Sequence, residues 1–156
     1  MTSDIHLVPA NESEIQQMLH HNSDEWKGAL SLEAYLRRED FLANQPLTKS
    51  GGLSTWALVQ GQGSERKLLC GCESISKKAL VARNGRVEES ICPGICSVFC
   101  PPHNRGKGYA GTMIRELGER LPDWQRDRGH VLFSALWSDI GKVRNFCTDW
   151  HWRLTV

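Results

Sequence analysis

The stretch from residue 98 to 117 constrains the fold of this chain more than any other, because its character changes three times along its length. It begins with an apolar segment that Pro101 and Pro102 interrupt. Glycines and basic residues alternate over 105–108, and apolar residues then recur every three or four positions, which is typical of an amphipathic helix. The stretch predicts a strand, a glycine-rich loop and a helix, in that order.

A glycine-rich loop at the start of a helix is suited to binding an anion. The first turn of a helix has unpaired backbone N–H groups and the positive end of the helix dipole. Glycines at this place let the backbone approach a bulky anion closely. Arg105 and Lys107 add positive charge at the rim of the loop. The loop therefore predicts a phosphate site.

Two other phosphate-binding motifs fit the loop less well. A P-loop requires G-x-x-x-x-G-K-[S/T], whereas Gly108 is followed by Tyr109 and no Ser or Thr is in place to bind magnesium. The spacing of Gly106, Gly108 and Gly111 matches the bare dinucleotide pattern G-x-G-x-x-G. The preceding strand ends at the two prolines, however, and the elements before it do not form a βαβ unit.

The length of 156 residues predicts a single domain, 1–156, and the remaining patterns predict an alternating α/β order. A helix follows a first strand and is capped by Asn11 or by Ser13, with Ser13 and Gln16 matching a capping box. A second helix begins at Ser31 and ends before Pro46. Residues 79–90 are mostly polar, with a turn at Asn84-Gly85. The strands are expected at 5–8, 54–60, 68–76, 94–100 and 131–137, with a helix from 108 and a short final helix after 138.

Charge and hydropathy exclude several classes of function. The net charge is +1, which gives no overall basic field for nucleic acid or an anionic membrane. No apolar run reaches the roughly 20 residues that a membrane span needs, and the first residues lack the pattern of a signal peptide. We therefore expect a cytoplasmic protein without a nucleic-acid or membrane partner.

The cysteine spacing argues against a metal site. No C-x-x-C pair occurs, and if Cys92, Cys96 and Cys100 lie on one strand, its ends are ~26 Å apart, too far to share one ion. A disulfide framework is not expected without a secretory signal. We expect free thiols and no metal at the six cysteines, which are Cys70, Cys72, Cys92, Cys96, Cys100 and Cys147.

The loop and its surroundings resemble a known family. The pyrophosphate-binding motif of the GNAT N-acetyltransferases, [Q/R]-x-x-G-x-[G/A] after a strand, is matched by Arg105-x-x-Gly108-x-Ala110 preceded by Val98-Phe99-x-Pro101. Segments within residues 26–142 resemble the fungal lysine N6-acetyltransferase branch: Leu30–Leu36, Gln45–Lys49, Trp56–Val59 and Trp137–Gly141. The resemblance implies an α/β (α+β) fold with a mixed, mostly antiparallel central sheet flanked by helices. It also implies acetyl-CoA as acyl donor and the side-chain amine of free lysine as acceptor.

The resemblance assigns roles to particular residues. Backbone N–H groups of the strand at Val98 and Phe99 are expected to face the acetyl oxygen and the pantetheine. Glu73 is our candidate general base, and its alternative reading is a solvated strand residue. We interpret His103 as a surface residue of the loop. The cofactor-binding residues are expected to be Val98, Phe99, Arg105, Gly106, Lys107, Gly108, Tyr109, Ala110 and Gly111.

The C-terminal segment departs from the family. GNAT enzymes use a tyrosine of the last helix to protonate the leaving thiolate, whereas one alignment places Cys147 at this position and another places Asn145 there. Residues 143–156 form an atypical tail without the final strands of the fold, and we interpret the chain as C-terminally truncated or altered after about residue 142. A retained intron is one hypothesis for this tail. A CoA-binding domain with weak or no catalysis therefore stays open as an alternative, as does a non-enzymatic interaction module, with a possible homodimer through an unpaired sheet edge.

Overall fold

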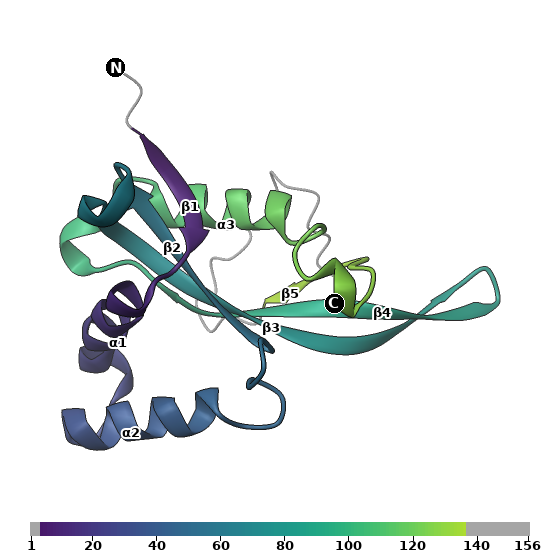
Figure 1. Cartoon of the computed structure of the whole chain (residues 1–156), viewed down its shortest axis with the longest axis horizontal. Coiled ribbons are helices and arrows are strands. Elements are labelled where there is room, and N and C mark those ends of the chain that lie inside the picture. The colour runs from purple at the N-terminus through teal and green to yellow at the C-terminus, as the bar shows by residue number, and fades with distance from the viewer. Residues whose placement is uncertain (1–3, 137–156) are drawn as a thin grey trace.

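The computed structural model describes residues 4–136, and these are built around one five-stranded sheet (Figure 1). The strands lie side by side in sequence order. The first four are antiparallel, and the last pairs in parallel with the fourth. The strands are β1 (Ile5–Pro9), β2 (Leu53–Gln60), β3 (Lys67–Arg83), β4 (Arg86–Phe99) and β5 (Ala135–Leu136).

Helices cover both faces of this sheet. Helices α1 (Glu12–Trp26) and α2 (Leu32–Ala43) lie on one side and α3 (Tyr109–Arg120) lies on the other (Figure 1). Three short 3-10 turns complete the described chain: Gly63–Glu65, Pro102–Asn104 and Arg126–Arg128. The predicted order of elements and the mixed, mostly antiparallel α/β class are confirmed up to β5. The predicted final helix and the tail 143–156 lie outside the described residues.

The predicted boundaries hold for α2 but need correction for the last strand. Ser31 caps α2 and the helix ends at Ala43, before Pro46, as expected. The strand expected over 131–137 is short, because β5 spans two residues and Val131 makes only an isolated bridge to β4.

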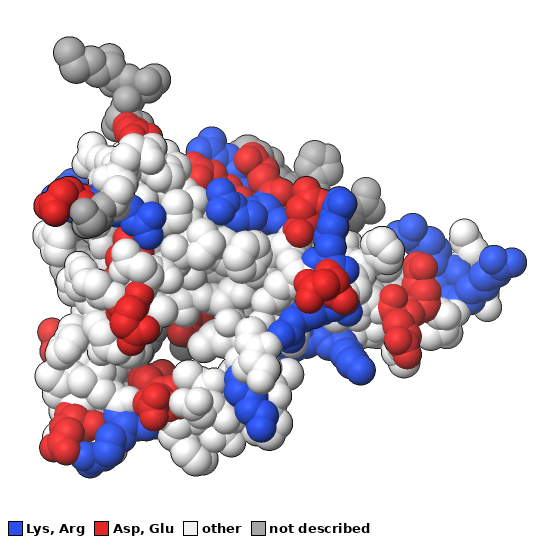
Figure 2. Space-filling view, viewed as in Figure 1, with Lys and Arg blue, Asp and Glu red and all other residues white. Residues whose placement is uncertain are grey.

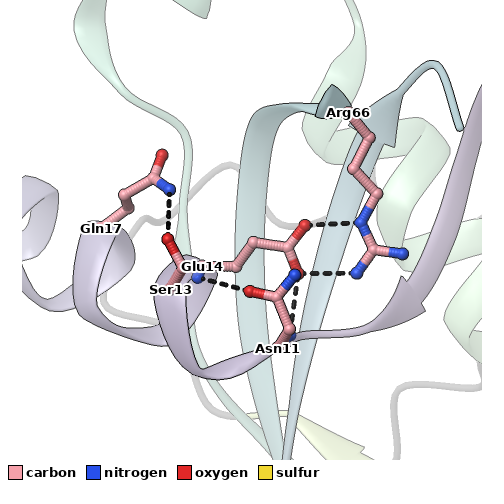
Figure 3. A network of polar contacts seen from close by, with 5 residues as sticks. All are labelled: Asn11, Ser13, Glu14, Gln17 and Arg66. Carbon is pink, nitrogen blue, oxygen red and sulfur yellow. Dashed lines mark hydrogen bonds and ion pairs between the residues drawn. The ribbon is translucent and has the colours of Figure 1, made fainter. Parts of the chain in front are cut away.

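The start of α1 is held by a polar network (Figure 3). The Asn11 side chain accepts a hydrogen bond from the Glu14 backbone N–H, and the Glu14 carboxylate accepts one from the Asn11 N–H at 2.8 Å. Arg66 then donates two hydrogen bonds, of 2.7 and 2.8 Å, to the same carboxylate. The capping box of Ser13 and Gln16 is therefore wrong and the alternative cap, Asn11, is confirmed. Arg66, which is 52 residues from Glu14 in sequence, stabilises the Asn11 cap by binding the Glu14 carboxylate.

The core follows the alternation of strand side chains between the two faces. The cluster toward α3 contains Leu7, Trp56, Leu58, Leu69, Met113 and Leu117. The intervening residues Ala57 and Val59 pack with Met18 of α1. The sheet is thus apolar on both sides where helices cover it.

β3 and β4 extend beyond the sheet as a two-stranded ribbon, shown at the right of Figure 1. The turn at Asn84 and Gly85 is confirmed, with positive φ angles of 52° and 72°. The residues on either side of it are paired strands, whereas the sequence predicted a polar connection. Leu80 and Val87 on this ribbon are 71% and 67% exposed.

Charges of both signs are interspersed over the face of the molecule shown in Figure 2, the ribbon included. This distribution agrees with the net charge of +1. None of the helices within residues 4–136 combines the length and the apolar character that crossing a membrane requires.

Candidate active site

A β-bulge interrupts the pairing of β3 with β4 next to the predicted loop. Glu73 pairs with Cys96, but Gly71 pairs with Phe99, so two residues of β4 lie opposite one residue of β3. Ser97, the first of these two, has a φ of 53°, which is in the left-handed region. A bulge leaves its extra residue out of the ladder and bends the strand. Backbone groups of β4 are thereby turned out of the sheet at the place where the acetyl group was expected.

The loop after β4 is hydrogen-bonded to the sheet at its start, and its two glycines border free space. The buried side chain of Asn104 donates a hydrogen bond of 2.8 Å to the Leu69 carbonyl oxygen of β3. Gly106 and Gly108 follow with φ angles of 76° and 79°. A Cβ atom at either position would have no heavy atom within 4 Å. These two positions combine a backbone that favours glycine with free space in front of it.

The N-terminus of α3 differs from those of the other two helices. Asn11 caps α1 and Ser31 caps α2 through their side chains, whereas α3 begins at Gly108, which has no side-chain cap. The N–H groups of the first turn of α3, from Tyr109 onward, therefore lack the partner that the other helices have. They are available to an anion, and the helix dipole favours one there.

Arg105 connects the loop to α1. Its guanidinium donates a hydrogen bond of 2.5 Å to the Glu25 carboxylate and one of 2.9 Å to the Cys100 carbonyl oxygen. It also lies over the Phe99 ring, at 5.6 Å from the ring centre. Trp26 packs edge-on against the same ring at 5.5 Å. The end of α1 is thus in contact with the predicted donor site, which the sequence did not indicate, and the charge of Arg105 is paired.

Glu73 lies on the face of the sheet that α1 and α2 cover. Gly71, two residues earlier, lies against Met18 of α1, so close that a Cβ atom there would be 2.3 Å from the methionine methyl group. Since strand side chains alternate, Glu73 projects to the same side. Burial raises the pKa of the half-buried Glu73 carboxyl; the neighbouring Ser97 side chain offsets part of this, and the charge of Glu39 raises it further. Glu73 is thus partly shielded from water, and its role as general base stays a prediction.

Helix α2 contributes residues that the sequence did not single out for the site. Tyr35 is its buried residue, with 1% of its surface exposed. Arg38 lies over the Tyr35 ring at 4.9 Å and forms an ion pair with Glu39. Burial and the charges of Glu39 and Glu73, in spite of Arg38, raise the pKa of Tyr35 to about 12, and nothing in the sequence indicated this.

The other residues considered from the sequence are one histidine and several cysteines. His103 is exposed, as expected, with its ring 6.3 Å from that of His21. Cys92 and Cys96 lie on β4, and burial raises the pKa of both thiols, which makes them poor nucleophiles. Within residues 4–136 no cluster of three or more His, Cys, Asp or Glu side chains could hold a metal ion. Cys147 lies outside the described residues.

Comparison with curated proteins finds two significant relatives. The chain is 31% identical over 133 residues to a lysine acetyltransferase of Yarrowia lipolytica, a match that covers 75% of this chain and 33% of that protein. It is 25% identical over 161 residues to an uncharacterized protein of Saccharomyces cerevisiae, covering 85% of this chain and 40% of that protein. The chain thus spans about a third to two fifths of the length of these relatives. No family model matches the chain.

Solved structures share the fold. An acetyltransferase of Trypanosoma brucei superposes with a TM-score of 0.61 at 18% identity, covering 98% of this chain and 95% of that one. An aminoglycoside 6'-N-acetyltransferase of Acinetobacter haemolyticus gives 0.59 at 15% identity, with coverage of 97% and 92%. A GCN5-related N-acetyltransferase of Kribbella flavida gives 0.58 at 20% identity, with coverage of 91% of this chain and 32% of that one.

Proposed function

Because this chain has the GNAT (GCN5-related N-acetyltransferase) fold and is related in sequence to a lysine acetyltransferase, we propose that it transfers an acetyl group from acetyl-CoA to a primary amine. The amine nitrogen forms a bond to the thioester carbonyl carbon, and the carbon–sulfur bond breaks. The acceptor ammonium loses two protons, of which one ends on the CoA thiolate and the other in solvent. The observation that carries this proposal is the N-terminus of α3, which begins at Gly108 without a side-chain cap and follows the bulged strand β4.

The residues of the loop fit the pyrophosphate of acetyl-CoA. The backbone N–H groups of residues 106–111 supply the donors, and Lys107 supplies exposed positive charge. Open space in front of Gly106 and Gly108 leaves room for the phosphates. N–H groups at Val98 and Phe99 would polarise the thioester carbonyl and stabilise the negative charge that develops on its oxygen.

Glu73 is proposed as the general base. A carboxylate accepts a proton more readily at neutral pH when its pKa is raised, and burial raises the pKa of Glu73. It would accept the proton of the acceptor ammonium directly or through one water molecule. Protonation of the leaving thiolate is assigned to Cys147 only as a prediction from the sequence alignment.

The acceptor proposed here is the side-chain amine of free lysine. The support is the name of the Yarrowia lipolytica relative together with the segments that resemble the lysine N6-acetyltransferase branch. We also propose a cytoplasmic location, since the free, buried thiols of Cys70, Cys72 and Cys92 suit a reducing compartment.

The decisive experiment has two steps. Calorimetric titration with acetyl-CoA tests the donor site, and release of free CoA thiol in the presence of lysine tests the transfer. We expect both binding and lysine-dependent thiol release. Binding without thiol release for any amine would favour a CoA-binding domain instead, and the lack of binding in a folded protein would refute the proposed function.

A further inference from the structure

Two cysteines lie opposite each other where β4 ends beside the glycine loop. Gly71 of β3 pairs with Phe99 of β4 in antiparallel register. Moving one residue along each strand places Cys70 opposite Cys100. Residues directly opposite in an antiparallel pair have Cα atoms about 4.5 or about 5.5 Å apart. Both spacings fall within the range of about 4.4–6.8 Å that a disulfide spans, so the backbone fits a bond between these two cysteines.

The two cysteine side chains also point to the same face of the sheet. Phe99 packs against Trp26 of α1, so the neighbouring Cys100 points to the opposite face, which α3 covers. Cys70 lies on that face too, because its Sγ is 3.6 Å from Sδ of Met113 in α3. Cys100 packs against the apolar cluster that contains Cys70 and Met113. The two thiols therefore face each other, and they share a side-chain hydrogen bond.

The other three cysteines within residues 4–136 have different neighbours across the sheet. Cys92 pairs with Lys77, and Cys96 pairs with Glu73. Cys72 precedes Glu73 in the strand and therefore points to the face opposite that of Cys96. A disulfide between these two would have to pass through the sheet. Among the described cysteines, the register thus singles out one pair.

We propose that Cys70 and Cys100 form a reversible disulfide, which ties the start of the glycine loop covalently to β3. The bond lies beside an existing contact of the same kind, since Asn104 donates its hydrogen bond to the carbonyl oxygen of Leu69, the residue before Cys70. Disulfides of reducing compartments are mostly transient and respond to the redox state. The pair is therefore a site of oxidative modification that makes the stability of this part of the chain depend on redox conditions. It does not depend on the proposed acetyl transfer.

The oxidant is a small disulfide such as glutathione disulfide. Cys100 reacts first, because it is only half-buried whereas Cys70 is 1% exposed. The Cys100 thiolate bonds to one sulfur of the small disulfide, whose sulfur–sulfur bond breaks and releases a first small thiolate. Cys70 then loses its proton to solvent, and its sulfur displaces the second small thiolate from Cys100. Both released thiolates take up a proton, so two protein thiols are oxidised and one small disulfide is reduced to two thiols.

The surroundings of the two thiols determine how the rate depends on pH. Burial raises the pKa of Cys100, and the charges of Arg105 and Lys107 offset part of this. The thiolate is therefore the minor form at neutral pH, and its fraction rises about tenfold per pH unit. We expect the rate of disulfide formation to rise by about that factor from pH 7 to pH 8. Burial raises the pKa of Cys70 as well, so the second step depends on the close approach of the two sulfurs.

Peptide mapping of the oxidised native protein tests this proposal. The folded chain is incubated with glutathione disulfide, its remaining thiols are alkylated, and the disulfide-linked peptides of a digest are identified by mass spectrometry. We expect a link between Cys70 and Cys100 as the main product, and its reversal by dithiothreitol. The Tm of the linked protein should be higher by roughly 5–15 °C, because the bond closes a long loop in the unfolded chain. Cys100→Ser should lose both the link and the rise in Tm, whereas the matched control Cys96→Ser, also half-buried on β4, should keep both.

Three results would overturn the proposal. The first is a main link between any other two cysteines; the same mapping of Cys147→Ser, which removes the cysteine outside the described residues, must still give the link between Cys70 and Cys100. The second is a mixed disulfide of glutathione with Cys100 that never proceeds to the link, because Cys70 would then be out of reach. The third is a lower Tm in the linked protein than in the reduced one, because the bond would then distort the strands. None of these measurements uses acetyl-CoA or lysine, so failure of the proposed function leaves this inference standing.

Discussion

The donor site can be tested at one glycine. In Gly108→Glu, a carboxylate would project from the start of α3 into the space proposed for the pyrophosphate. The φ of 79° makes any non-glycine residue costly there, but no neighbouring atom lies within 4 Å of the new Cβ atom. The protein should therefore fold with only the backbone cost, about 1–2 kcal/mol, equivalent to a Tm lower by about 2–8 °C.

The structure offers a matched control for that cost. Gly85, at the tip of the ribbon, has a φ of 72° and likewise no atom within 4 Å of a Cβ atom. Gly85→Glu should lower the Tm as much as Gly108→Glu does and leave acetyl-CoA affinity unchanged. Gly108→Gln adds the same volume as glutamate without its charge and separates obstruction from repulsion.

The expected loss of acetyl-CoA affinity in Gly108→Glu follows from Coulomb's law. Two like charges about 4 Å apart repel by about 1 kcal/mol in water and about 4 kcal/mol at the effective dielectric constant near a protein surface. The loop is exposed, so the lower part of this range applies for each phosphate charge. We expect Gly108→Glu to bind acetyl-CoA at least about tenfold more weakly than Gly108→Gln, because about 1.4 kcal/mol corresponds to a factor of ten.

Calorimetric titration with acetyl-CoA at low and high salt measures this difference, which should shrink as salt screens the repulsion. Lys107→Ala should weaken binding much less than Gly108→Glu, since the backbone N–H groups supply most of the contacts. Equal affinity of folded Gly108→Glu and Gly85→Glu proteins would refute the assignment of the loop to the pyrophosphate.

Three further predictions concern other parts of the chain. Glu25→Gln removes the negative charge that pairs with Arg105 but leaves the Arg105 hydrogen bond to Cys100, so acetyl-CoA should bind more tightly by calorimetry. Stability should change by less than about 1 kcal/mol, and weaker acetyl-CoA binding would contradict this prediction. Although burial opposes it, the hydrogen bonds from Arg66 and from the backbone at Asn11 lower the pKa of Glu14, so its stabilisation is present above about pH 4.5 and is lost as the pH falls through the lowered value. Denaturant unfolding from pH 7 to pH 3 should show that loss in wild type, and an equal loss in Glu14→Gln would count against it. Cys147→Tyr should raise turnover by ~10²–10⁴ at unchanged acetyl-CoA affinity, and no gain would mean that Cys147 does not occupy the position of the general acid.

The loop and α3 could be predicted from sequence because their signals are local. Prolines end the strand, glycines allow positive φ angles, and the apolar spacing after Gly108 has the helical period. The element order could be predicted for the same reason. The ribbon could not, because both faces of its outer part are exposed and its residues form no apolar pattern that marks a strand.

The surroundings of Glu73 depend on pairings between distant segments, which the sequence does not state. Glu73 lies on the face that α1 covers only because of the register of β3 against its neighbours. The cap of α1 shows the same limit, since Asn11 and Ser13 are both suitable caps and Arg66 supports only one of the two. Contacts between distant segments decide such cases, and propensity alone does not.

The bulge of β4 also has a meaning for how sequences of this kind are aligned. Cys96 and Phe99 lie on the same face of the sheet although three positions separate them, because one extra residue has shifted the alternation between them. Deleting Ser97 would leave each remaining side chain of β4 on its present face, with Phe99 still opposite Gly71, and would restore an unbroken ladder. Such a chain would keep the glycine loop and the core of the parent yet return the N–H groups near Val98 to the sheet. A one-residue gap between the positions of Cys96 and Phe99 is therefore the place in an alignment where the proposed acetyl transfer would be lost while the fold persists.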